Sequence, residues 1–186
     1  MGRIEAIITD FDGTLVNTFK ANYYAYKEAF IQYGYELTEE QYKECYGLRY
    51  DNLCDKMNIK EEHKLPIKEL KKKLYPSYFQ HLGLNLNVLN FIKASKIIYG
   101  LKTCIASTAS KENLYNVLNH FCIAQYFDVI ITGEDVKFGK PNPEVYIKAL
   151  EKLNIKNDQA IVFEDSEVGC LAAYDAGINY IEVKNI

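Results

Sequence analysis

The chain alternates short apolar runs with segments whose apolar residues recur at helical spacing, and this alternation is regular from Leu89 onward. Short continuous runs rich in β-branched residues are typical of buried strands, whereas apolar residues three and four positions apart predict amphipathic helices. The expected strands lie at residues 4–8, 101–106, 127–132, 160–163 and 179–183. Repeated strand–helix units of this kind predict an α/β fold with a doubly wound, parallel, Rossmann-like sheet.

Polar residues, proline and glycine mark the ends of the expected helices. Ser110 and Ser166 are each placed to cap a helix, because a serine side chain can accept a hydrogen bond from the first free backbone N–H groups. Asn142-Pro143 predicts a further helix start, with proline at the first helical position. Gly177 is expected to end the last helix.

One interval breaks the alternation. About 90 residues separate Asp12 from the strand expected at Leu101, far more than the dozen or so that a crossover needs. This excess has helical periodicity, with a stop at Gly34 and a capping box that begins at Thr38. Two more helices are predicted at residues 51–57 and 67–78, with Pro66 and Pro76 as breaks.

We therefore expect two domains. Residues 1–16 and 88–186 would form the α/β core, and residues 17–87 would form a small inserted helical cap domain, rejoining the core through a flexible linker at 83–87. The insertion emerges directly after the first strand, so we expect it to act as a lid.

Tyrosine is concentrated in this insertion, where half of the 16 tyrosines lie between Tyr23 and Tyr50. One interpretation is a small helical core, in which each ring is buried while its hydroxyl stays in contact with water. The other is an aromatic surface that contacts a substrate. The sequence does not separate the two.

Composition narrows the class of protein. A formal net charge of -3 gives no electrostatic footprint for nucleic acid, and no apolar run approaches membrane-spanning length. The five cysteines are scattered, odd in number and without CxxC spacing, which is typical of buried thiols in a reducing compartment. No basic-then-apolar targeting signal precedes the first strand. These features predict a soluble cytoplasmic protein that does not bind nucleic acid or a membrane, and leave its oligomeric state open.

The first expected strand ends in two carboxylates, Asp10 and Asp12, followed by Gly13 and Thr14. Open α/β sheets bind ligands at the carboxyl ends of their strands. A simple turn explains one aspartate before a glycine, but not a second carboxylate two residues away, because like charges repel. Such a pair typically binds a metal ion or divides the roles of acid and base.

Other polar residues follow later strands. Alone, Ser107 would be a turn residue, Lys140 a surface lysine and Asp165 a charge at a helix N-terminus. Glu164 and Asp165 are adjacent acids after an apolar strand, which favours a compensating cation. Carboxylates, a hydroxyl and a lysine at one edge of a sheet together predict an active site.

In order and spacing these residues resemble the four motifs of the haloacid dehalogenase (HAD) superfamily. Within it they resemble the phosphatase and β-phosphoglucomutase-like branch, which carries a helical cap after the first motif. The matching segments are Asp10-Phe11-Asp12-Gly13-Thr14-Leu15, Ser107, Gly139-Lys140-Pro141-Asn142-Pro143 and Glu164-Asp165-Ser166. The resemblance covers residues 4–17 and 100–184, and covers the cap only in position and helical character.

The resemblance implies a phosphatase that hydrolyses a small phosphomonoester, of the sugar or polyol phosphate class, through an aspartyl-phosphate intermediate. Asp10 would be the nucleophile. Asp12 would protonate the leaving alkoxide and then deprotonate the attacking water. Ser107, Thr108 and Lys140 would bind the phosphoryl oxygens.

The resemblance also implies Mg2+ as cofactor. The carboxylate of Asp10, the backbone carbonyl of Asp12 and the carboxylate of Asp165 would hold the ion, with Glu164 either a ligand or just outside the coordination sphere. In the cap, Arg49 is a candidate contact to phosphate or sugar, and a solvent-exposed arginine is the alternative.

Two alternatives stay open beside the phosphatase. A β-phosphoglucomutase-like phosphotransferase is disfavoured by Asn22, which stands where the mutases carry a histidine. A non-catalytic binding or regulatory module on the same fold is disfavoured because every catalytic position holds a competent residue. Asp12 argues against a dehalogenase, since halide leaves without a proton.

Overall fold

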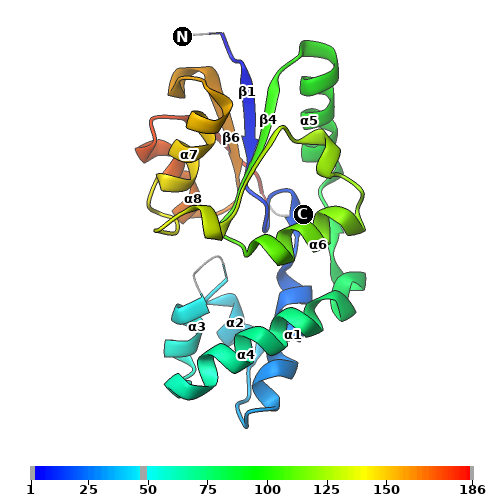
Figure 1. The fold of residues 1–186 in the computed structure, drawn as a ribbon, viewed down its shortest axis with the longest axis vertical. Coiled ribbons are helices and arrows are strands. Elements are labelled where there is room, and N and C mark those ends of the chain that lie inside the picture. The colour runs from blue at the N-terminus through cyan, green and yellow to red at the C-terminus, as the bar shows by residue number, and fades with distance from the viewer. Residues whose placement is uncertain (1–2, 47–49, 185–186) are drawn as a thin grey trace. The chain divides into compact units, whose positions relative to one another are not determined.

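The computed structural model describes residues 3–46 and 50–184. The chain forms two compact units, one made of Met1–Asn17 with Leu84–Ile186 and the other of Thr18–Gly83 (Figure 1). Among the described residues, no helix is both long and apolar enough to cross a membrane.

The first unit is built on a five-stranded sheet with the order β5-β4-β1-β6-β7. Its paired strands are all parallel, which confirms the predicted α/β fold. The strands are β1 (Ala6–Thr9), β4 (Lys102–Ala106), β5 (Val129–Ile131), β6 (Ala160–Glu164) and β7 (Asn179–Glu182). Because β1 is central and the strands are parallel, the chain segments that follow β1, β4 and β6 emerge at the same edge of the sheet.

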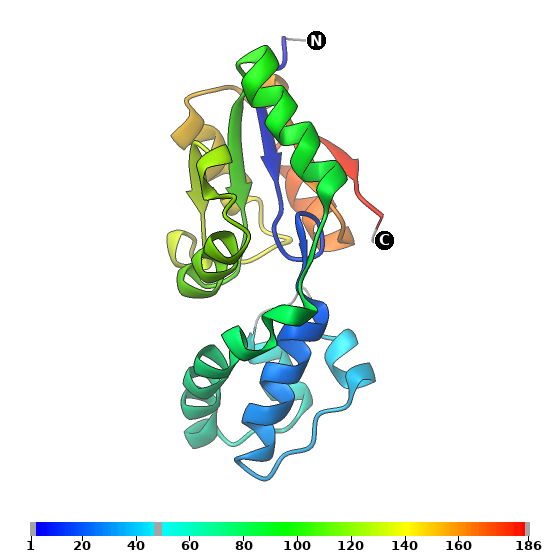
Figure 2. The ribbon, with the colours of Figure 1, turned by 90° about the vertical axis from the view of Figure 1, so that its right-hand side faces the viewer.

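Helices cover both faces of this sheet. Figure 1 shows α5 and α6 on one face and α7 and α8 on the other, and Figure 2 shows α5 running alongside β1. The helices are α5 (Leu86–Tyr99), α6 (Lys111–His120), α7 (Glu144–Leu153) and α8 (Glu167–Asp175). Three short 3-10 turns complete the unit, namely η2 (Ala124–Tyr126), η3 (Gly133–Asp135) and η4 (Asn157–Gln159).

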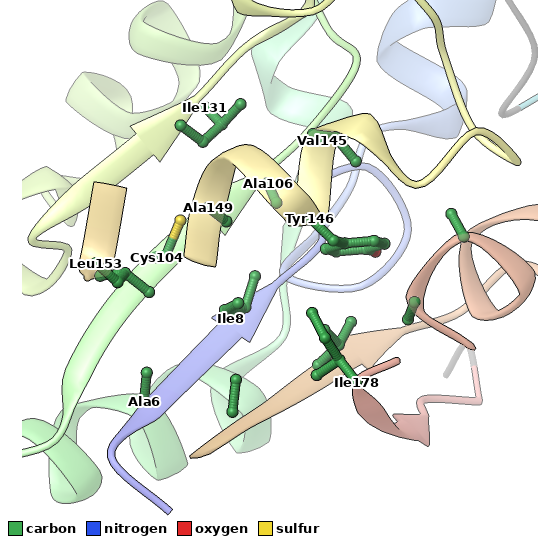
Figure 3. Close-up of a cluster of buried hydrophobic side chains, with 14 of the residues drawn as sticks. Ala6, Ile8, Cys104, Ala106, Ile131, Val145, Tyr146, Ala149, Leu153 and Ile178 are labelled. Carbon is green, nitrogen blue, oxygen red and sulfur yellow. The ribbon is translucent and has the colours of Figure 1, made fainter. Parts of the chain in front are cut away.

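One apolar core of this unit lies between the sheet and α7 with α8 (Figure 3). Side chains from neighbouring strands meet one face of α7, and all of them are buried. The residues labelled in Figure 3 are Ala6, Ile8, Cys104, Ala106, Ile131, Val145, Tyr146, Ala149, Leu153 and Ile178. Burying a large apolar side chain contributes about 1.5–3 kcal/mol, so this cluster anchors α7 firmly beside the strand ends.

The second unit is helical. It comprises α1 (Phe19–Ile31), α2 (Glu39–Lys43), α3 (Tyr50–Lys56), α4 (Glu61–Leu74) and the 3-10 turn η1 (Tyr75–His81). Helix α1 packs against α4 and η1. The predicted capping box at α2 is confirmed, because the Thr38 side chain accepts from the Gln41 N–H while the Gln41 side chain accepts from the Thr38 N–H.

The tyrosine-rich stretch builds the core of this helical unit. Tyr23 and Tyr42 are buried in it, and further tyrosines pack around them half-buried. The ring of Tyr26 stacks on that of Tyr50, with centroids 5.7 Å apart and planes 10° apart. These contacts support the interpretation of the tyrosines as core residues.

Three local predictions are wrong. Pro66 lies inside α4 instead of breaking it, so the carbonyl of Glu62 lacks its usual helical donor. The segment expected to be a flexible linker pairs as β3 (Gly83–Leu84) with β2 (Val16–Asn17), and α5, which was not predicted, follows at once. Cys122 is exposed, whereas the other four cysteines are buried as expected.

Candidate active site

The end of β1 lies between the ends of β4 and β6. Thr9 is in register with Ile105 on one side and with Phe163 on the other. The backbone N–H of Asp10 donates to the carbonyl of Phe163 over 2.9 Å. This bond continues the ladder by one residue, so the Asp10 side chain leaves the sheet at its carboxyl edge, between its neighbours.

Lys140 reaches this edge from the loop before α7. Its ammonium donates to Oδ1 of Asp10 over 2.5 Å and to Oε2 of Glu164 over 2.6 Å. The three side chains are 6%, 9% and 1% exposed for Lys140, Asp10 and Glu164. A lysine from a distant part of the sequence therefore bridges two buried carboxylates at the carboxyl ends of adjacent strands.

The Lys140 loop is itself fixed by Glu144, the first residue of α7. Its Oε2 accepts the backbone N–H groups of Lys137 and Phe138 over 2.9 and 2.8 Å. These bonds hold the pKa of Glu144 below its usual value. The loop is thereby tied to the helix that packs on the core.

The Glu164 carboxylate accepts five hydrogen bonds from the protein. Oε2 accepts from Lys140 and from the hydroxyl of Tyr146, the latter over 2.6 Å. Oε1 accepts from the backbone N–H of Asp165 and from both the backbone N–H and the hydroxyl of Ser166. A carboxylate offers about four lone-pair sites, so the capacity of Glu164 is filled by its protein donors.

Two glycines make room for the acids. A Cβ on Gly169 would lie 2.0 Å from the carboxyl carbon of Glu164, and a Cβ on Gly13 would lie 2.1 Å from Oδ2 of Asp165. Gly13 also has a φ of +98°, which other residues rarely adopt. The backbone turn and the close approach of Asp165 both favour glycine at this position.

Asp165 completes a group of acids. Asp10, Glu164 and Asp165 each offer a carboxylate oxygen, and these oxygens lie within 4.8 Å of one another. The hydroxyl of Thr14 donates to Oδ1 of Asp165 over 2.7 Å, which fixes the orientation of that side chain. Three carboxylates and one ammonium leave an excess of negative charge, which suits a divalent cation with oxygen ligands.

Burial and neighbouring charges together shift the pKa values of these buried groups. Burial, reinforced by the charge of Glu164, raises the pKa of Asp10 well above its usual value. Burial alone would also raise the pKa of Glu164, but Lys140 and the other donors lower it. Burial alone would lower the pKa of Lys140, but the charges around it, Asp10 first, raise it well above the usual range. Lys140 is therefore a permanent cation in this site.

The other residues predicted for the site lie at the same edge or nearby. Ser107 is buried directly after β4, and its Oγ accepts from the backbone N–H of Ala109 over 3.0 Å, so its own O–H stays available for donation. Thr108 and Asp12 are half-buried, and Asp12 forms a bridge with Val16 in the turn after β1. Arg49 lies outside the described residues.

Sequence reasoning missed three residues that shape the site. Thr14 stands in the first motif without a predicted role, and no role is predicted for Glu144. Tyr146 lies on the apolar face of α7, where helical periodicity agrees with its burial but gives no sign that the hydroxyl meets Glu164. The one signal for such a role in the sequence is the hydroxyl group of Tyr146, a polar group on an otherwise apolar helix face.

A family model described as haloacid dehalogenase-like hydrolase matches residues 7–183. The chain belongs to this family. A phosphorylated carbohydrates phosphatase from Thermotoga maritima is 34% identical over 185 residues, which are 96% of this chain and 84% of the relative. Membership confirms the resemblance inferred from the motifs.

Solved structures of HAD proteins share the fold. A putative β-phosphoglucomutase from Thermotoga maritima is 30% identical with a TM-score of 0.72, covering 98% of this chain and 88% of that one. CbbY from Rhodobacter sphaeroides, in complex with phosphate, is 25% identical with a TM-score of 0.87, covering 98% and 87%. This HAD chain is thus a hydrolase of the phosphatase and β-phosphoglucomutase-like branch, with the acidic triad of the family.

Proposed function

We propose that the protein is a Mg2+-dependent phosphatase that hydrolyses small sugar or polyol phosphates through an aspartyl-phosphate on Asp10. The observation that carries the proposal is the buried Lys140 ammonium between Asp10 and Glu164, beside a third carboxylate. The name of the Thermotoga maritima relative, a phosphorylated carbohydrates phosphatase, supports the substrate class.

The proposed reaction has two steps, the formation of an aspartyl-phosphate on Asp10 and its hydrolysis. An oxygen of Asp10 attacks phosphorus, the bond to the substrate oxygen breaks, and Asp12 gives its proton to the departing alkoxide. Asp12 then takes a proton from water, whose oxygen attacks phosphorus and displaces the Asp10 carboxylate. Inorganic phosphate leaves, and both aspartates return to their starting states.

Lys140, Ser107 and Thr108 are proposed to bind the phosphoryl oxygens. The permanent charge of Lys140 would stabilise the negative charge that spreads over these oxygens in the transition state. The Ser107 side chain keeps an O–H to donate. A neutral O–H donor together with a charged ammonium donor is suited to binding an anion. Thr108 adds a second hydroxyl one residue further along.

The residues present fit a magnesium ion. The carboxylates of Asp10 and Asp165 with the backbone carbonyl of Asp12 would supply its oxygens, and the five protein donors on Glu164 favour a place for that residue outside the coordination sphere. When bound, the ion would supply positive charge that keeps Asp10 ionised and screens its repulsion from the phosphate.

The helical insert is proposed to select the substrate. Residues 17–87 would be the cap domain and residues 1–16 with 88–186 the catalytic domain, with Arg49 as the candidate contact to the substrate. A cytoplasmic location belongs to the same proposal, because the five free thiols suit a reducing compartment.

Water is the proposed phosphoryl acceptor. Oδ1 of Asn22 accepts a hydrogen bond from Lys71 over 2.6 Å, and an amide cannot exchange a proton as the histidine of a mutase would. This arrangement favours hydrolysis over transfer to a second sugar hydroxyl.

The test is phosphate release from a panel of sugar, polyol and nucleoside monophosphates, with Mg2+ and with EDTA. Asp10→Asn should lose roughly 10³-fold or more in kcat, because the nucleophile is gone. Asp175→Asn makes the same change at an exposed position and should retain activity. No release from any substrate by folded wild type with Mg2+ would overturn the proposal. Conversion of β-glucose 1-phosphate to glucose 6-phosphate without release would show a mutase instead.

A further inference from the structure

Tyr146 touches both members of the Lys140–Glu164 pair. Its hydroxyl donates to Oε2 of Glu164 over 2.6 Å, the same oxygen that accepts from Lys140. The centre of its ring lies 5.0 Å from the Lys140 ammonium. The side chain is fully buried, and α7 is packed on the core through Val145 and its other apolar residues.

These contacts restrict the ammonium in two ways. An ammonium near an aromatic ring is attracted by the ring's quadrupole, more strongly where water is excluded. The hydroxyl fixes the position of Oε2, and a hydrogen bond to a charged group is worth about twice a neutral one. Burial raises the pKa of Tyr146 well above its usual value, so the hydroxyl stays a donor.

We propose that Tyr146 is a positioning residue, whose hydroxyl holds Glu164 so that the Lys140 ammonium stays against Asp10. It acts through Lys140 and Glu164, and the rigid packing of α7 is what makes the position reproducible. The effect on turnover rests on the proposed function, whereas the effect on the ammonium itself does not.

Tyr146→Phe keeps the ring and removes the hydroxyl. Among the described residues, Lys140 is then the one side-chain donor left on Oε2 of Glu164, and the buried pair can shift relative to Asp10. Because Lys140 would act on charge that develops in the transition state, kcat should fall about tenfold, while KM should stay within about twofold.

A second readout follows Lys140 directly. Ordered, hydrogen-bonded lysine ammonium groups give resolved ¹H–¹⁵N cross-peaks in NMR spectra, and a chain of 21.5 kDa is suitable for this measurement. The Lys140 cross-peak is identified by its absence in Lys140→Arg. In Tyr146→Phe we expect this cross-peak to shift and to broaden through faster exchange with water.

Val145→Ala is the matched control. Val145 precedes Tyr146 on α7 and is equally buried, so its truncation loosens the helix without removing a polar contact. Truncating a buried side chain lowers the free energy of unfolding, so we expect a lower melting temperature. The kcat and the Lys140 cross-peak should stay unchanged.

The outcomes separate the two proposals. An unchanged Lys140 cross-peak with kcat within about twofold of wild type in Tyr146→Phe would overturn the positioning role. An equal loss of kcat in Val145→Ala would also overturn it, because general loosening would then explain the effect. If wild type releases no phosphate, the phosphatase proposal fails, and the cross-peak alone decides the role of Tyr146.

Discussion

Thr14 donates a hydrogen bond of 2.7 Å to Asp165, although 151 positions separate the two residues in the chain. The bond links the turn after β1 to the acid that follows β6. It restrains the orientation of the Asp165 carboxylate within the acidic group.

Removing this bond should weaken metal binding. Thr14→Val has nearly the same shape but no hydroxyl, and loss of a partner that orients a metal ligand typically costs about 10–100-fold in metal affinity. The apparent Mg2+ constant for phosphate release and the affinity measured by calorimetry should both weaken by that factor. Thr14→Ser keeps the hydroxyl and should behave as wild type. Equal metal affinities for Thr14→Val and wild type would contradict the assigned role.

A methyl group at position 169, against the Glu164 carboxylate, should lower both stability and kcat. In Gly169→Ala the new Cβ collides with the Glu164 carboxylate, and overpacking of this kind typically costs about 1–3 kcal/mol in free energy of unfolding. Because Glu164 holds Lys140, kcat should also fall. Gly34→Ala is the control, since its Cβ meets open space and only the left-handed backbone costs about 1–2 kcal/mol. If both variants keep wild-type kcat, the close packing beneath Glu164 does not matter for turnover.

Asp128 should make the stability of the α/β unit depend on acid pH. Burial alone would raise the pKa of Asp128, but hydrogen bonds from Lys96 and Thr103 lower it below the usual value. An acid with a lowered folded-state pKa stabilises the fold above the unfolded pKa of about 3.9, and this stabilisation is lost as pH falls through the folded value.

Urea unfolding of wild type and Asp128→Asn at several pH values measures this contribution. The variant should be less stable than wild type at pH 7, and the two should converge below a pH of about 4. A stability difference that stays constant from pH 7 to pH 3 would show that the charge of Asp128 is not responsible.

The capping box of α2 should contribute to the stability of the helical unit. Thr38→Ala removes the acceptor for the Gln41 N–H and should lower the free energy of unfolding by about 1 kcal/mol. Tyrosine fluorescence can follow the transition, because the chain has no tryptophan. Thr38→Ser should retain most of the stability. A free energy of unfolding for Thr38→Ala equal to that of wild type would show that the cap is not needed.

Features that depend on neighbouring residues could be predicted from the sequence. The caps at Thr38, Ser110 and Ser166 are confirmed, because each is a bond between a side chain and a backbone group three residues away. The parallel sheet also followed from local patterns, since strand and helix periodicities alternate along the chain. The motif residues at the strand ends gave the family, which the comparison confirms.

Features that depend on distant residues could not be predicted. The pairing of Val16–Asn17 with Gly83–Leu84 joins two-residue strands that have no periodicity of their own. Pro66 lies in a helix because the packing of α4 on α1 outweighs the loss of one hydrogen bond. The five donors on Glu164 come from three chain segments that only the fold brings together. The catalytic, phosphate-binding and metal-binding roles stay predictions.

The short pairing of β2 with β3 has a consequence for how the helical unit is joined to the sheet. The chain leaves the sheet through Val16–Asn17 and returns through Gly83–Leu84, and these segments are hydrogen-bonded to each other. An inserted segment is tolerated where its two ends lie close together, because the rest of the domain can then fold with little change at the junction. An insert whose two ends lie equally close could therefore replace the helical unit at this junction without changing the strand order.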